Sequence, residues 1–146
     1  MLSIVVPAFN AGRTIDSCIN SLLSQTVHRD SYEVIIVDNG STDDTAVRIR
    51  NYPTIYVYEP NCSVYAARNT GASTATGDII AFTDSDCIAD EKWLESGLEH
   101  LQQFDIITGR IEPLLSARKL LYAYDKYVSR QPLEGLGRDV NISAAN

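Results

Sequence analysis

An apolar run that ends directly in acidic residues decides how this sequence is interpreted. Residues 77–86 read GDIIAFTDSD. The segment 79–82 is short and apolar and follows Gly77-Asp78, which is typical of a buried β-strand. Asp84 and Asp86 come next, so two carboxylates can face one cation such as Mn2+ or Mg2+. A D-x-D pair alone is weak, because acidic turns are common, but its position after a buried strand favours a ligand site.

The same pattern of a strand followed by polar residues occurs twice more. Residues 2–7 form a nearly continuous apolar run, rich in β-branched residues, that ends before Asn10, and residues 32–37 end at Asp38-Asn39. Further strands are expected at residues 55–58 and 105–108. Apolar spacing and capping residues predict helices at about 15–23, after Ser41-Thr42, at 63–75, after Asp90 and at 117–128, with a loop at 129–139.

Strands that alternate with helices predict an α/β fold with a mainly parallel sheet and helices on both faces. Ligands bind beyond the carboxyl ends of the strands in such sheets. Three strand ends should therefore bring Asn10, Asp38-Asn39 and Asp84-Ser85-Asp86 to one edge. The 146 residues suit a single domain.

The charge of the chain excludes one class of partner. The net charge is −7, and Lys and Arg residues form no cluster. Because binding to a nucleic-acid backbone depends on such clusters, no nucleic-acid partner is expected. An acidic protein that binds an anionic ligand needs a metal ion or local donors to do so.

The cysteines and the hydropathy indicate a cytoplasmic protein. Cys18, Cys62 and Cys87 form no CxxC pair, so a zinc site is not expected and a reducing compartment is the simplest interpretation. No run approaches the roughly 18 apolar residues that span a bilayer, and no signal peptide is evident. Peripheral association with the inner face of the membrane and homo-oligomer formation stay open.

Two further residues are candidates for nucleotide contacts. The carboxylate of Asp38 could accept a hydrogen bond from a nucleobase or a ribose hydroxyl; a plain turn explains Gly40 and Ser41, but an acid next to a buried strand is costly unless it is paired. Arg68 lies on a helix with a small-residue surface and could reach a diphosphate or a base. A surface arginine on a tightly packed helix explains Arg68 equally well.

Taken together, these segments resemble family 2 glycosyltransferases of the GT-A fold, the Rossmann-like fold of nucleotide-diphospho-sugar transferases. The resemblance covers about residues 2–95 and keeps the expected order. The matching stretches are SIVVPAFN at 3–10, SLLSQT at 21–26, EVIIVDNGSTD at 33–43, ARN-x-G at 67–71 and residues 77–86.

The resemblance implies an inverting, metal-dependent transfer of a sugar from a UDP-sugar to an acceptor hydroxyl. It implies that Mn2+ or Mg2+ is held against the donor diphosphate by Asp86 together with Asp84. Asn39 stands where many members carry a second Asp, which leaves the base selectivity open. The implied nucleotide-binding residues are Pro7, Ala8, Phe9, Asn10, Asp38, Asn39, Arg68, Asp84 and Ser85.

The resemblance does not identify the catalytic base. In the family this acid lies downstream of a segment that resembles residues 141–146, so the base is expected beyond Asn146. The carboxylates nearer to that end stand in no matching motif; they are Glu112, Asp125, Glu134 and Asp139.

Because no catalytic base is identified, the domain is expected to be incomplete. We expect one GT-A domain at 1–146, incomplete at its C-terminus, with a nucleotide-binding part at 1–110 and the start of an acceptor part at 111–146. Such a chain should bind donor and transfer sugar poorly.

Two alternatives to an active transferase remain. The first is a non-catalytic nucleotide-sugar-binding fragment, which the missing base favours. The second is a phosphatase that resembles the haloacid dehalogenases, which also place D-x-D after a buried strand. Ile88 stands where that family carries Thr or Val, and too little chain follows the acidic pair.

Overall fold

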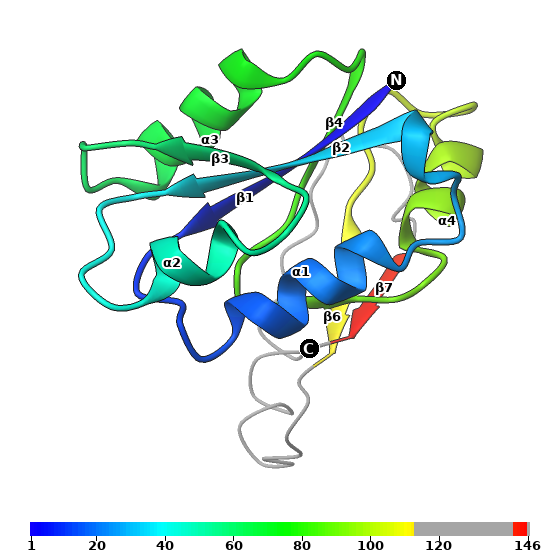
Figure 1. The fold of residues 1–146 in the computed structure, drawn as a ribbon. Helices are drawn as coiled ribbons and strands as arrows, with labels where there is room; N and C mark the ends of the chain where they lie inside the picture. The colour runs from blue at the N-terminus through cyan, green and yellow to red at the C-terminus, as the bar shows by residue number, and fades with distance from the viewer. Residues whose placement is uncertain (113–141, 146) are drawn as a thin grey trace, which may run out of the picture.

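The computed structural model describes residues 1–112 and 142–145. Its first half alternates strands with helices, and a short 3-10 helix precedes the second strand (Figure 1). The elements are β1 Leu2–Ala8, α1 Ile15–Leu23, η1 Arg29–Ser31, β2 Tyr32–Asp38, α2 Thr45–Ile49, β3 Ile55–Tyr58, α3 Val64–Thr74, β4 Ile79–Phe82, β5 Ile88–Ala89, α4 Trp93–His100, β6 Gly109–Glu112 and β7 Ile142–Ala145.

A four-stranded parallel sheet with the order β3-β2-β1-β4 forms the centre of the fold. The central strand β1 is buried along its whole length, which explains its nearly continuous apolar sequence. Val5 pairs with Ile35 on one side and with Phe82 on the other. All the strands of this sheet run in the same direction, so their carboxyl ends lie at one edge.

Helices cover both faces of this sheet, as Figure 1 shows for α1 and α2 on one side and α3 on the other. Successive side chains of a strand point to opposite faces, so neighbouring residues of β1 enter different cores. Ile4 and Val6 pack in the core with α1 residues such as Ile19, and Val5 packs with Ala67 of α3. The expected α/β fold is confirmed.

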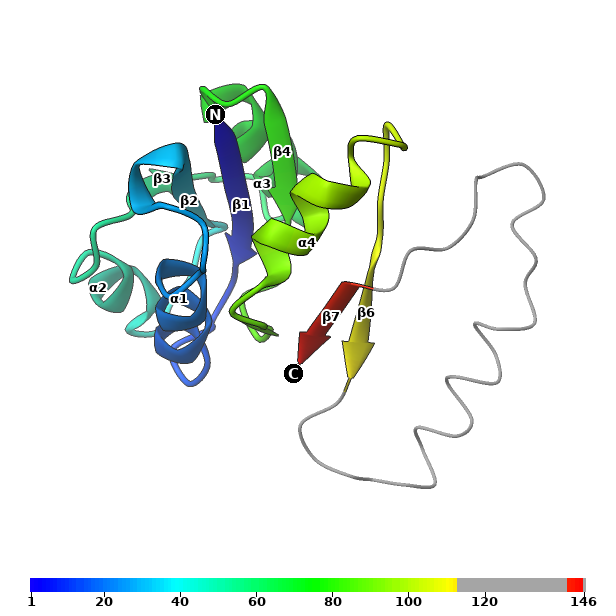
Figure 2. The same cartoon turned by 90° about the vertical axis from the view of Figure 1, so that its right-hand side faces the viewer.

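The fifth strand was predicted at residues 105–108, and this prediction is wrong. The structure has no strand there; β6 begins at Gly109 and belongs to a second, mixed sheet with the order β5-β7-β6. Figure 2 shows β6 and β7 side by side, on the side of the molecule where α4 lies. The partner of β6 lies at 142–145, so pairing with a distant segment decides where this strand begins, not the local apolar pattern.

Part of the sequence prediction lies outside the described residues. This applies to the helix at 117–128, the loop at 129–139 and the carboxylates of Asp125, Glu134 and Asp139. It applies equally to Asn146, so a catalytic base beyond that residue stays a prediction.

The described part of the chain also bears on membrane-spanning helices and on the cysteines. Among the helices that the structure describes, none combines the length and hydropathy needed to cross a membrane. Each of the three cysteines has a free thiol.

Candidate donor-binding site

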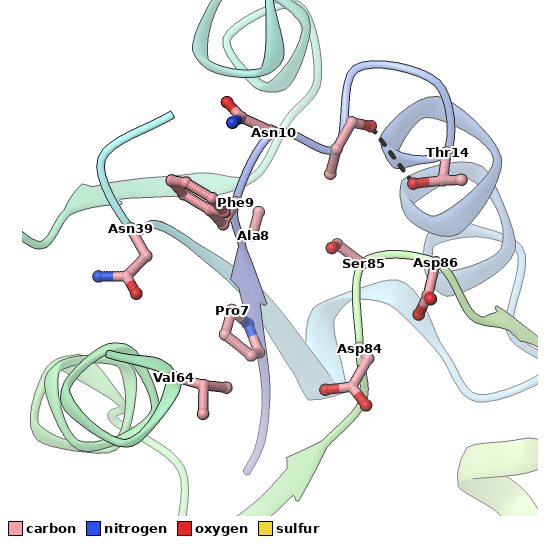
Figure 3. A pocket seen from close by; sticks show the side chains of 11 residues that line it. Pro7, Ala8, Phe9, Asn10, Thr14, Asn39, Val64, Asp84, Ser85 and Asp86 are labelled. Atoms are coloured by element: carbon pink, nitrogen blue, oxygen red, sulfur yellow. Dashed lines mark hydrogen bonds between the residues drawn. The ribbon is translucent and has the colours of Figure 1, made fainter. Parts of the chain in front are cut away.

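A cleft of about 400 Å³ lies at the carboxyl ends of β1, β2 and β4 (Figure 3). The structure thus brings together the three strand ends that were predicted to lie at one edge. The cleft is lined by Pro7, Ala8, Phe9, Asn10, Ala11, Thr14, Asn39, Val64, Asp84, Ser85 and Asp86.

The acidic residues of the cleft lie on a turn between β4 and β5. The backbone N–H of Cys87 donates to the carbonyl oxygen of Asp84 at 3.1 Å, which closes the turn. The side chain of Asp84 is half exposed, and Asp86 is exposed. Asp86 thus lies in a loop, accessible to solvent and outside the core.

A buried thiol supports the acidic turn from the core side. The Cys18 Sγ donates to the carbonyl oxygen of Asp84 at 3.6 Å, and only 1% of Cys18 is exposed. Burial, helped by the nearby Cys87, Asp86 and Asp84, raises the pKa of the Cys18 thiol to about 12. The thiol therefore stays protonated at neutral pH and can donate to the turn.

Arg68 reaches the acidic turn from α3. Its Nη2 donates to the Oδ1 of Asp84 at 2.8 Å, and 34% of its side chain is exposed. Arg68 does not line the cleft, so a direct contact with the nucleotide remains a prediction. The observed contact holds the carboxylate of Asp84 through one of its two oxygens.

The composition of the turn fits a hard divalent cation that is shared with a ligand. Asp84 and Asp86 supply carboxylate oxygens, and among the described residues no group of three His, Cys, Asp or Glu side chains could hold a metal ion. Mg2+ and similar cations often bind through one or two carboxylates and fill the remaining positions with substrate phosphates and water. The two carboxylates match that pattern.

Asp38 and Asn39 lie at the end of β2 but have different surroundings. Only 2% of Asp38 is exposed, and its oxygens accept from the Ser41 backbone N–H and the Tyr56 hydroxyl, each at 3.0 Å. Burial, with a smaller part from the bond to Asp38, raises the pKa of Tyr56. Asp38 therefore supports the loop and does not line the cleft, and its predicted base contact stays untested.

Asn39 does line the cleft, and its amide has a defined orientation. The Nδ2 donates to the carbonyl oxygens of Glu59, at 3.2 Å, and Asn61. A carbonyl oxygen only accepts, so the amide nitrogen must face this pair. Figure 3 shows the amide oxygen of Asn39 on the opposite side, toward Pro7 and Val64. The amide oxygen of Asn39 thus faces the cleft as a hydrogen-bond acceptor.

The loop after β1 is tied to the loop after β2. The Asn10 Oδ1 accepts from the backbone N–H of Thr42 at 2.8 Å, and the Asn10 N–H donates to the hydroxyl of Ser41 at 3.0 Å. Asn10 has a φ of 49°, a left-handed conformation that asparagine tolerates better than most residues. These contacts hold Phe9 at the rim, where 56% of it is exposed.

Comparison with known proteins identifies the family. A family model for glycosyl transferase family 2 matches residues 3–127. The chain belongs to glycosyl transferase family 2. The comparisons give no support to the phosphatase alternative.

Curated relatives of this glycosyltransferase chain extend well beyond it. Glycosyltransferase AglE of Haloferax volcanii is 32% identical over 146 residues, which cover 94% of this chain and 48% of AglE. Validoxylamine A glucosyltransferase of Streptomyces hygroscopicus subsp. jinggangensis is 33% identical over 104 residues, which cover 67% of this chain and 25% of that enzyme. The chain thus spans about half or less of the length of these relatives.

Solved structures confirm the GT-A fold of this family 2 glycosyltransferase chain. Glucosyl-3-phosphoglycerate synthase of Mycobacterium tuberculosis, crystallised with Mn2+, UDP and glucosyl-3-phosphoglycerate, is 28% identical; the match covers 92% of this chain and 55% of that one, with a TM-score of 0.65. S. aureus TarS with UDP is 23% identical, with 79% and 36% covered and a TM-score of 0.73. At that identity TarS bears on the fold alone.

Some residues that line the cleft were not among the candidates from the sequence. They are Ala11, Thr14 and Val64. Thr14 and Val64 lie at the starts of α1 and α3, and helices that follow parallel strands begin at the ligand-binding edge. The position of a residue just after a predicted loop was therefore the available signal.

Proposed function

We propose that this chain binds the nucleoside diphosphate of a UDP-sugar, as the donor-binding part of an inverting, metal-dependent glycosyltransferase. The observation that carries the proposal is the shared cleft of the acidic turn and the ends of β1 and β2. Support for UDP and for the metal comes from the relative at 28% identity, which was crystallised with both.

The geometry of Asn39 favours uracil as the base. The amide oxygen faces the cleft, and the N3–H of uracil is a donor that can bond to it. The corresponding N3 of cytosine is an acceptor, which the same oxygen would repel. The exposed ring of Phe9 at the rim offers an apolar surface to the base.

The acidic turn is the proposed site for Mn2+ or Mg2+. Asp86 and Asp84 would hold the cation, which when bound supplies positive charge to the diphosphate and lowers the cost of its departure. Without it, two carboxylates and a net charge of −7 would disfavour an anionic ligand. Arg68 would keep the Asp84 carboxylate directed at the cleft.

The transfer step needs a base that deprotonates the acceptor hydroxyl, and inversion follows from direct displacement at the sugar carbon. Among the described carboxylates, Glu112 is exposed and pairs with Arg110 at 3.1 Å, and nothing connects it to the cleft. The base and the acceptor are therefore not assigned, and a base beyond Asn146 stays a prediction. The alternative function is a donor-binding module without transfer activity, and an assay of UDP-sugar hydrolysis and transfer separates the two.

A nucleotide panel tests the proposed function. Titration calorimetry with UDP, CDP, GDP and ADP in the presence of Mn2+ should show the tightest binding for UDP. Equal affinity for all four nucleotides would contradict the base contact of Asn39. The cytoplasmic location, a peripheral membrane contact and a homo-oligomer remain predictions that this panel does not address.

The ion pair of Arg68 leads to a separate prediction. The Arg68→Ala variant should bind UDP about tenfold more weakly in Mn2+, because loss of a partner that orients a metal ligand typically costs 10–100-fold in metal affinity and this pair is partly exposed. Calorimetry and a thermal melt of the same sample check this result.

The matched control is Arg110→Ala, which removes an exposed pair with Glu112 and should change neither quantity. If Arg68→Ala lowers the thermal midpoint but leaves the affinity for UDP unchanged, Arg68 has only a structural role.

A further inference from the structure

The two carbonyl groups that orient Asn39 are themselves fixed by a buried carboxylate. Glu59 follows β3 and is only 8% exposed. Its Oε1 accepts from the backbone N–H and from the Nδ2 of Asn61, each at 2.8 Å. Its Oε2 accepts from the hydroxyl of Thr70 on α3. Glu59 thus clamps the segment 59–61 to a helix while lying outside the cleft.

The backbone of Glu59 adds a second connection. Its N–H donates to the carbonyl oxygen of Asp38 at 2.9 Å, one residue before Asn39. The side chain and the backbone of one residue therefore hold both the loop that supplies the carbonyl groups and the strand end that supplies the amide. A small movement of Glu59 would change the position of the carbonyl pair relative to Asn39.

The carboxylate of Glu59 is charged under ordinary conditions. The hydrogen bonds from Thr70 and Asn61 lower its pKa below the usual value for glutamate. No ion pair involves Glu59 within residues 1–112. A buried carboxylate without a cation is costly unless hydrogen bonds satisfy it, and here three donors do so.

We propose that Glu59 is a positioning residue that sets the nucleobase preference of the donor site; the inference rests on the proposed base contact of Asn39. An asparagine amide can turn by 180° and present either its oxygen or its NH2 group. The oxygen accepts from uracil, whereas the NH2 group would donate to the N3 of cytosine. The carbonyl oxygens of Glu59 and Asn61 oppose the second orientation, because they would then face the amide oxygen.

The ratio of the affinities for UDP and CDP in Mn2+, measured by calorimetry, tests this role. In the Glu59→Ala variant, the ratio of the affinity for UDP to that for CDP should fall about tenfold. This is the size of effect expected when one polar contact is no longer held in place. Thr70→Val, which removes one end of the clamp, should change the ratio in the same direction by a smaller factor. Glu59→Gln should restore it, since its amide can accept from Asn61 and donate to the Thr70 hydroxyl.

The control is Thr74→Val, the same substitution one turn further along α3. The Thr74 hydroxyl donates to the carbonyl oxygen of Thr70 at 2.8 Å, within the helix, so the ratio should not change. If Glu59→Ala does not fold, Thr70→Val decides the question.

The possible results distinguish the positioning role of Glu59 from the base contact of Asn39. A wild-type preference for UDP that survives in Glu59→Ala and Thr70→Val would overturn the role of Glu59 alone. Equal weakening of UDP and CDP in both variants would do the same, since it indicates a structural effect. A wild-type chain that binds UDP and CDP equally would overturn the base contact of Asn39 and the role of Glu59 with it.

Discussion

Replacing Asp86 with alanine should remove most of the Mn2+-dependent binding of UDP and leave the fold intact. Asp86 is exposed on the turn between β4 and β5, and its carboxylate accepts from the Cys87 thiol at 3.9 Å. The substitution removes one of the two carboxylates of the proposed metal site. We expect a loss of about 100-fold, the upper end of what weaker perturbations of a metal site cause.

A thermal melt of the same protein distinguishes a binding effect from a folding effect. Surface substitutions usually change stability by less than about 0.5 kcal/mol, which moves the midpoint of a domain this size by roughly 2 °C or less. The control is Asp30→Ala, another exposed carboxylate, whose Oδ2 lies 3.8 Å from the Nδ1 of His28. If the Asp86→Ala chain unfolds, or binds UDP as tightly as the wild type in Mn2+, the proposed metal site is wrong.

The largest effect on stability should follow from Gly71→Ala. An added Cβ at this position in α3 would lie 2.2 Å from the Cγ1 of Val5 and 3.1 Å from the Cγ2 of Val37. Both valines are fully buried in the sheet, so the added methyl group must displace either a valine or the helix. Overpacking of a core costs about 1–3 kcal/mol, and replacing a helical glycine recovers up to about 1 kcal/mol.

We therefore expect a net loss of about 1–2 kcal/mol in the free energy of unfolding, measured by urea titration. The control is Gly12→Ala, where the added Cβ meets the carboxylate of Asp44 at 2.1 Å. Asp44 is exposed, and turning away costs at most its exposed ion pair with Arg48, so the loss of stability should be much smaller. A Gly71→Ala chain as stable as the wild type would show that α3 packs less closely on the sheet than the structure indicates.

The main sheet and its helices could be predicted because their signals are local. The residues of β1 are apolar except for Ser3, and Ile15, Cys18, Ile19 and Leu22 repeat with the period of a helix and are buried in α1. The second sheet could not be predicted in this way. Its strand β5 has two residues, and β6 is defined by pairing with β7, about 30 positions later in the chain.

The site shows the same division between local and distant information. The sequence marks Asp38 and Asn39 together, because both follow a buried strand. The hydrogen bond from Tyr56 shows that Asp38 supports the loop. The hydrogen bonds to the carbonyl groups of Glu59 and Asn61 show how the amide of Asn39 is oriented in the cleft. These partners are 18 to 22 residues away, and no local pattern connects them.

The contact that Arg68 makes could not be predicted from the sequence either. Its position on a helix of small residues indicates that it can come close to the sheet, but not what it contacts. The structure places its guanidinium on Asp84, 16 residues further along the chain. The residue thus belongs to the site through an acidic ligand, which a linear motif does not reveal.

The most direct test of the account is the affinity of the wild-type chain for UDP in Mn2+ and in EDTA, measured by titration calorimetry on the same preparation. We expect tight binding in Mn2+ and a loss of most of it in EDTA, because Asp84 and Asp86 would then face the diphosphate without a cation between them. Equal affinity for UDP in Mn2+ and in EDTA would contradict it.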